Sequence, residues 1–181
     1  MTNDKKVVFE TDWFSVEQEN FDHIESLQGM PFYRIVQPDG VIILAFTDYN
    51  EIVLIQQFRP ALNNYTVELP SGDKHTSEKP HEAAARELYE ETGYICKELT
   101  QIGDGTNLVN RINSKFFAFL GTGATQNPDF QPEEDIRVVL KQPDEFKAMV
   151  QSGEFDNLAM LGLLVLAGWK TSSRLPNKYT F

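Results

Sequence analysis

The sequence predicts an α/β layered sandwich. Strand-like apolar segments recur from about residue 6 to residue 141, and turn-forming residues such as Pro38-Asp39-Gly40 and Asp48-Tyr49-Asn50 separate them. A few helix-like segments stand between and after these strands, which favours a sheet covered by helices. At 181 residues, 41% of them hydrophobic, the chain suits one compact domain or a domain with a small appendage.

The strands are predicted from their composition and pattern. Residues 6–17 and 31–37 are rich in Val, Phe, Tyr and Ile. The run 41–46 is apolar at every position, and this lack of alternation predicts a strand that is buried on both faces. We expect the remaining strands at 52–58, 65–69, 94–102, 114–120 and 135–141.

The clearest helix is predicted over residues 80–92. Pro80 suits its first turn, the alanines at 83–85 favour it, and Gly93 is placed to end it. Two more helices, at about 143–151 and 156–170, are expected to close the chain. We expect residues 1–38 to form a small N-terminal β-unit, too small to be stable alone, and residues 39–181 to form the main domain.

Composition and charge exclude several classes of protein. The formal net charge is −11, with 27 acidic and 16 basic residues, so we expect no nucleic-acid partner. No run of about 18 apolar residues occurs, and no apolar core follows the N-terminal lysines, so neither a membrane span nor a secretory signal is expected. The single cysteine, Cys96, fits a reducing cytoplasm and is expected to be an inert, buried thiol. The three histidines lack zinc-ligand spacing.

Three glutamates on the 80–92 helix form a candidate metal site. Glu87, Glu90 and Glu91 stand at i, i+3 and i+4, so their carboxylates project from one helix face. Such like charges destabilise a helix unless a cation compensates, and magnesium or manganese prefers carboxylate oxygen. Arg86 lies four residues from both Glu82 and Glu90, and such pairs can hold one glutamate in place. The alternative is a solvated acidic helix face.

The wider segment Gly72–Tyr94 resembles the signature of the Nudix hydrolase family. The motif requires Gly, five residues, Glu, seven residues, Arg-Glu, apolar, any residue, Glu-Glu, any residue, Gly and apolar. Its specified positions are in register, with only the aromatic Tyr94 departing from the usual aliphatic residue: Gly72, Glu78, Arg86, Glu87, Leu88, Glu90, Glu91 and Gly93. The resemblance implies a Nudix α/β/α sandwich with a mixed central sheet, and hydrolysis of a nucleoside diphosphate linked to another group.

The same resemblance implies roles for individual residues. Glu87 and Glu91 are similar to the principal metal ligands, Glu90 to a further or water-bridged ligand, and the carbonyl of Ser71 to another. The resemblance also implies that Arg86 and Glu90 belong to the catalytic residues. The implied cofactor is Mg2+, with Mn2+ as a possible substitute, because cations that bridge a diphosphate neutralise its charge and activate water.

Two segments outside the motif resemble the ADP-ribose pyrophosphatase and nucleoside-diphosphate-sugar branch. In residues 54–60 and 67–72, Arg59 is similar to a residue that contacts the diphosphate or terminal sugar, and Glu68 is a candidate metal or substrate contact. Both have a structural alternative, as a surface arginine and an edge-strand glutamate. In the acidic run 131–138, Glu134 is the best match to the catalytic base, with Glu133 as the second candidate and a solvated loop as the alternative.

The expected substrate is a nucleoside-diphosphate sugar. ADP-ribose-specific members usually carry a proline some fifteen or sixteen residues after the motif, where this chain has Val109 and Asn110, so GDP-mannose or a broad specificity stays open. Arg111 is a candidate phosphate or sugar contact. Trp13, with its neighbour Phe14, resembles aromatic residues that stack on the base across a homodimer, and core or interface packing is the alternative.

Other functions stay open at this stage. The chain could hydrolyse another nucleotide, such as a dinucleoside polyphosphate or a coenzyme. It could also be a non-catalytic Nudix protein that binds a nucleotide sugar, although the intact glutamates argue against that. In this branch N-terminal β-units are exchanged between subunits, so the resemblance implies a homodimer.

Overall fold

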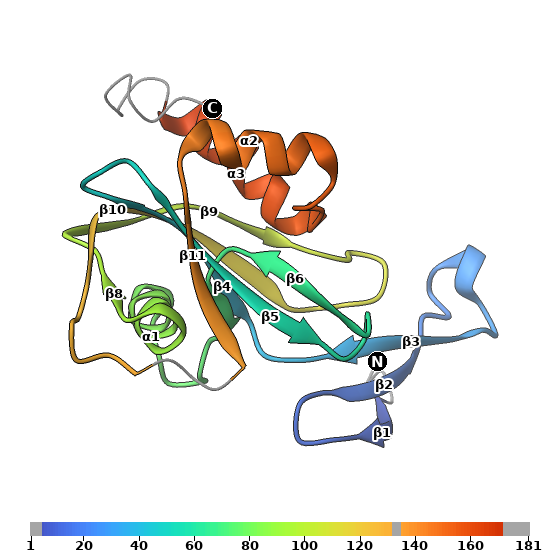
Figure 1. Ribbon diagram of the computed structural model, residues 1–181. Coiled ribbons are helices and arrows are strands. Elements are labelled where there is room, and N and C mark those ends of the chain that lie inside the picture. Colours follow the sequence, from blue (N-terminus) through green and yellow to red (C-terminus); the bar gives the residue numbers. More distant parts are fainter. Residues whose placement is uncertain (1–4, 132–134, 172–181) are drawn as a thin grey trace.

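The computed structural model describes residues 5–131 and 135–171. In these ranges, a mixed sheet is covered by α1 (Pro80–Thr92) on one face and by α2 (Pro143–Ser152) and α3 (Leu158–Thr171) on the other (Figure 1). The α/β sandwich and its mixed central sheet, both predicted from the sequence, are therefore confirmed. No helix in the described ranges has the length and apolar character needed to cross a membrane.

The central sheet contains eight strands within the described residues. Their bounds are β4 (Gly40–Thr47), β5 (Ile52–Arg59), β6 (Asn64–Glu68), β7 (Ser71–Asp73), β8 (Tyr94–Ile95), β9 (Glu98–Thr106), β10 (Lys115–Gln126) and β11 (Ile136–Lys141). The order is β11-β5-β4-β10-β8, with β6 on β5, β7 on β4 and β9 on β10. The β4–β10 pair is parallel and the other pairs are antiparallel, which makes the sheet mixed.

Strand β4 divides the core into two halves. All of its residues are buried, as the unbroken apolar run predicts. Because side chains alternate along a strand, Val41, Ile43 and Ala45 pack with α1, while Ile42, Leu44 and Phe46 pack with α2 and α3. The α1 side chains in the first cluster are Ala83, Ala84 and Leu88. This packing fixes α1, and with it the acidic helix face, against the sheet.

The helices agree closely with the predicted ranges: α1 (Pro80–Thr92), α2 (Pro143–Ser152) and α3 (Leu158–Thr171). In the central sheet, two strand expectations need correction. The strand expected at 94–102 is divided into β8 and β9, with residues 96 and 97 between them. Strand β7 was not expected, and it forms because residues 71–73 pair with residues 40–42 of β4.

The N-terminal residues form a separate three-stranded antiparallel sheet from β1 (Lys6–Glu10), β2 (Ser15–Asn20) and β3 (Pro31–Val36), with a short 3-10 helix at Glu25–Leu27. The single strand expected at 6–17 is wrong. Thr11 accepts the backbone N–H groups of Trp13 and Phe14 at 3.2 and 3.0 Å, so the chain turns there into a hairpin.

Candidate functional site

The loop between β7 and α1 is held by hydrogen bonds to its own backbone. The ammonium group of Lys74 donates to the carbonyls of His75 and Glu78, at 3.2 and 3.3 Å. The backbone N–H of His75 donates to the Glu78 carboxylate at 3.2 Å. The loop therefore turns back on itself and delivers the Glu78 side chain to the helix that follows.

Helix α1 begins and ends where its sequence predicts. Pro80 occupies the first turn, and the Glu82 carboxylate accepts the backbone N–H of Lys79 at 2.9 Å. Gly93 ends the helix with a φ of 71° in the left-handed region. The expected pairing of Glu82 with Arg86 is wrong, because the Glu82 carboxylate caps the helix instead.

Arg86 is the centre of an ionic network. Its Nε and Nη2 donate to the two Glu78 oxygens at 3.0 and 2.9 Å, and Nη1 donates to Glu87 at 2.6 Å and to Glu90 at 2.9 Å. Nη2 also donates to the Asp73 carbonyl at 2.8 Å. The hydrogen bond to Glu78 has the largest effect on the pKa of Arg86, and together with those to Glu87 and Glu90 it raises this pKa above its usual value. The predicted pair with Glu90 is present, and all three guanidinium nitrogens are engaged in ordering the loop and the helix.

Two predicted metal ligands lie beside the backbone of β7. The N–H of Ser71 donates to the Glu91 carboxylate at 2.9 Å. A Cβ on Gly72 would overlap the carboxyl group of Glu87, so only glycine leaves room for that side chain. In a strand the N–H and C=O of one residue point to the same side, so the Ser71 carbonyl also faces α1. The structure thus brings together Ser71, Glu87 and Glu91.

Burial, more than neighbouring charge, shifts the pKa values of the carboxyl groups around β7. Burial raises the pKa of Glu91 to about 8, the charge of Glu87 adds to this, and the hydrogen bond from Ser71 offsets only part. Burial also raises the pKa of Glu87 and of Asp73, although the charge of Arg86 lowers both. A bound cation would compensate this clustered charge and favour the ionised carboxylates.

The donor set fits a hard divalent cation. Glu87, Glu90 and Glu91 each keep one carboxylate oxygen that makes no hydrogen bond to a described residue. With the Ser71 carbonyl, these are the oxygen ligands that Mg2+ and Mn2+ prefer. Over the described ranges, however, no three Asp, Glu, His or Cys side chains are already grouped at metal-binding distance. Arg86 holds Glu87 and Glu90, so these two carboxylates must reorient to share a cation.

Arg59 and Glu68 form an ion pair across the β5–β6 hairpin. Nε and Nη2 of Arg59 donate to the two Glu68 oxygens, both at 2.7 Å, and the Thr66 hydroxyl donates to Glu68 at 2.6 Å. Burial disfavours ionisation of Glu68, but the hydrogen bonds from Arg59 and Thr66 hold its pKa below the usual value. The charge of Arg59 also lowers the pKa of Glu91. The pair therefore lies close to the metal-ligand candidates.

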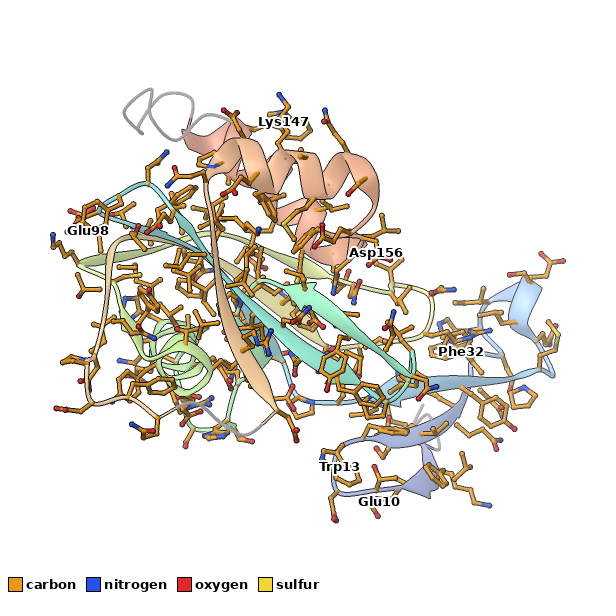
Figure 2. The ribbon with its side chains drawn as sticks, in the orientation of Figure 1. Glu10, Trp13, Phe32, Glu98, Lys147 and Asp156 are labelled. Atoms are coloured by element: carbon orange, nitrogen blue, oxygen red, sulfur yellow. The ribbon has the colours of Figure 1, made fainter. Side chains whose placement is uncertain are left out.

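Arg111 and Trp13, the other predicted substrate contacts, lie at the N-terminal sheet. The Arg111 guanidinium stacks on the ring of Phe32, 4.7 Å from its centre, and the Arg111 carbonyl accepts the N–H of Ile35 at 2.8 Å. Trp13 lies at the β1–β2 turn, where it is 74% exposed (Figure 2). Within the described chain, neither residue forms a hydrogen bond or ion pair with the α1 carboxylates.

The acidic loop is described only in part. Glu133 and Glu134 lie outside the described residues, so their catalytic role stays a prediction. A hollow of about 700 Å³ adjoins the described end of this loop and is lined by Asp135, Ile136 and Phe130, among others. The Phe130 ring packs edge-on against Tyr89 of α1, with ring centres 5.8 Å apart. The hollow therefore lies next to the helix that carries the three glutamates.

Parts of this network were not predicted from the sequence. Asp73 and Thr66 were not singled out, and Glu78 was recognised in the motif without its role as the bidentate partner of Arg86. The spacing of Glu78 before Arg86 was an available signal. Thr66 stands two residues before Glu68, and this period places both side chains on one strand face. Cys96 is half-buried rather than buried, and burial raises its pKa to about 11, which agrees with the predicted low reactivity of its thiol.

Comparison with known proteins places the chain in a family. The model of the NUDIX domain matches residues 36–162, and the chain therefore belongs to the Nudix family. A solved structure of an ADP compounds hydrolase superposes with a TM-score of 0.75, covers 95% of each chain and is 20% identical in sequence. That likeness shows the shared fold.

Two curated relatives match shorter stretches. The chain is 44% identical to the ADP-ribose pyrophosphatase of Bacillus subtilis (strain 168) over 68 residues. This stretch makes up 38% of this chain and 37% of that protein. Over 80 residues the chain is 38% identical to the methanol dehydrogenase activator of Bacillus methanolicus, 43% of each protein. The matched stretches thus span less than half of either relative.

Proposed function

We propose that this protein hydrolyses the pyrophosphate bond of nucleoside-diphosphate sugars, giving a nucleoside monophosphate and a sugar phosphate. The observation that carries the proposal is the placement of Glu91 against the backbone of Ser71 and of Glu87 against that of Gly72, at the start of the Nudix loop and helix. Membership of the Nudix family and the similarity to an ADP-ribose pyrophosphatase support it.

We propose that Mg2+, or Mn2+ in its place, is the cofactor. Glu87, Glu91 and the Ser71 carbonyl would hold it, with Glu90 as a further ligand. When bound, such a cation supplies charge neutralisation on the diphosphate and favours deprotonation of water. The raised pKa of Glu91, about 8, supports this assignment, because that carboxylate needs a positive neighbour to stay ionised at neutral pH. Burial raises the pKa of Glu87 as well.

The chain's own residues divide the remaining work. Arg86 keeps the loop and the helix in register, through the contacts that occupy its guanidinium. Arg59 binds an oxygen of the diphosphate or of the terminal sugar. Glu134, with Glu133 as the second candidate, accepts a proton from the attacking water, and both lie outside the described residues.

The proposed substrates are ADP-ribose, GDP-mannose or a similar compound. The matched ADP-ribose pyrophosphatase favours ADP-ribose, whereas Val109 and Asn110 in place of a proline leave the specificity broader. Trp13 is proposed to stack on the base. Arg111, which is held on the Phe32 ring and donates to the Asn110 carbonyl, is proposed to contact a phosphate or sugar oxygen.

We further propose that the protein is a cytoplasmic homodimer formed through residues 1–38. The N-terminal sheet exposes large apolar side chains that a partner subunit would cover, among them Val7, Phe9 and Trp13. The single cysteine fits a reducing compartment. Light scattering coupled to gel filtration should give about twice the 20.7 kDa chain mass, and a mass of one chain would contradict the dimer.

A substrate screen tests the proposed activity. The protein is incubated with Mg2+ and ADP-ribose, GDP-mannose or a dinucleoside polyphosphate, and a phosphatase then releases phosphate only from the monoester products. We expect cleavage of at least one nucleotide sugar, and none by Glu87→Gln when circular dichroism shows an intact fold. Absence of product from every nucleotide sugar would refute the activity, and binding without cleavage would favour a non-catalytic nucleotide-sugar-binding protein.

A further inference from the structure

The guanidinium of Arg59 is held along one edge only. Nε and Nη2 donate to Glu68 in a fork-to-fork arrangement at 2.7 Å, whereas Nη1 makes no hydrogen bond to any residue that the structure describes. The Arg59 side chain is 41% exposed, and it lines a hollow of about 450 Å³. The free edge of the guanidinium is therefore open to a ligand.

The carboxylate of Glu68 is occupied by its protein partners. Its Oε1 accepts hydrogen bonds from both Arg59 and Thr66, its Oε2 accepts the second bond from Arg59, and its side chain is only 6% exposed. A carboxylate held in this way offers little surface to a sugar hydroxyl or a cation. The Thr66 hydroxyl donates its hydrogen bond to Glu68, so it acts on Arg59 through Glu68.

We propose that Glu68 and Thr66 are positioning residues, which fix Arg59 so that its free guanidinium edge receives a phosphate or sugar oxygen of the substrate. This inference rests on the proposed function and assigns Glu68 a different part in it from direct contact with substrate or metal. The physical gain is preorganisation. A free arginine loses rotamer freedom when it binds an anion, whereas Arg59 is already ordered before the ligand arrives.

A double-mutant cycle on Arg59 and Glu68 tests this proposal. Binding of ADP-ribose is measured by calorimetry on the full chain for the wild type, Glu68→Gln, Arg59→Ala and the double variant, and KM and kcat are measured in parallel with Mg2+. We expect Glu68→Gln to weaken binding and raise KM by about tenfold, with a smaller change in kcat. In the Arg59→Ala background, the same substitution should change binding by less than about twofold.

Thr66 supplies an independent test with a conservative rescue. Thr66→Val removes the hydroxyl that donates to Glu68 and should raise KM by about threefold, while Thr66→Ser keeps the hydroxyl and should restore it. A matched control is the pair Thr47 and Glu51, which share a similar hydrogen bond of 3.0 Å at the other end of β5. Thr47→Val and Glu51→Gln should leave KM unchanged.

Each result separates the proposed alternatives. If Glu68→Gln weakens binding equally with and without Arg59, Glu68 contacts the substrate directly and the positioning role is refuted. If it instead lowers the affinity for Mn2+ alone, Glu68 is a metal ligand, which also refutes the proposal. Should Arg59→Ala not fold, Arg59→Lys completes the same cycle.

A wild type that binds ADP-ribose without cleaving it would refute the proposed activity only, because the binding cycle still tests the positioning role. A wild type that binds no nucleotide sugar would refute both.

Discussion

Replacing Glu91 with glutamine tests the electrostatic account of the metal site. Burial raises the pKa of Glu91 to about 8, from 4.5 for an unperturbed glutamate. Between these pH values the folded protein binds a proton that the unfolded chain has released. The folded state is therefore stabilised fully below pH 4.5 and loses that stability as the pH rises toward 8.

The magnitude follows from the two pKa values. Each pH unit between 4.5 and about 8 removes about 1.4 kcal/mol, so metal-free protein should lose on the order of 4 kcal/mol of unfolding free energy over this interval. For a chain of 181 residues, this corresponds to a fall in Tm of roughly 10 °C. Glutamine cannot ionise and can still accept the N–H of Ser71, so Glu91→Gln should lack this loss.

The assay is thermal unfolding in EDTA from pH 5 to pH 8, followed by circular dichroism. The control is Glu98→Gln, since Glu98 is an exposed glutamate on β9 (Figure 2) and its substitution should leave the wild-type pH profile unchanged. Adding Mg2+ at pH 8 should restore stability to the wild type but not to Glu91→Gln. Parallel pH profiles for the wild type and Glu91→Gln in EDTA would refute the reasoning.

Three further substitutions test the supports of the site. Gly72→Ala places a Cβ on the Glu87 carboxyl group and should lower kcat by about 100-fold, and an unchanged kcat would contradict the close approach. Arg86→Lys loses the bidentate contact with Glu78 and should cost about 2–3 kcal/mol in urea unfolding, whereas an unchanged midpoint would show that the network contributes little. Gly93→Ala forces a side chain into φ 71° against Phe130 and should cost at least about 1–2 kcal/mol by the same measurement.

Local sequence signals predicted the scaffold of the site well. Pro80 and Gly93 mark the two ends of α1 because each acts through its own backbone, with no contribution from distant residues. The apolar run of β4 likewise reports burial on both faces directly. The fixed spacing of the Nudix motif then placed Glu87 and Glu91 on the helix face that meets β7.

Features that depend on distant partners could not be predicted in this way. Strand β7 has no apolar pattern and is defined by its pairing with β4, about thirty residues earlier in the chain. The hairpin turn at Thr11 depends on the Thr11 hydroxyl, which accepts the backbone N–H groups of Trp13 and Phe14 in place of a strand partner. The pairing of Arg59 with Glu68 requires the register of β5 on β6, in which Arg59 lies opposite Asn64 and Glu68 opposite Ile55. Both side chains are then on one face of the hairpin, and that of Arg59 reaches along the face to Glu68.

The central claim is that Glu87, Glu91 and the Ser71 carbonyl hold a divalent cation against the diphosphate of the substrate. A crystal of the protein with Mn2+ and a non-hydrolysable ADP-ribose analogue tests it most directly, through the anomalous scattering of manganese. We expect a manganese peak within coordination distance of both carboxylates and the Ser71 carbonyl, with the diphosphate bound to the same ion and Arg86 retained by Glu78. A manganese ion bound elsewhere, or a diphosphate remote from Glu87 and Glu91, would contradict the account.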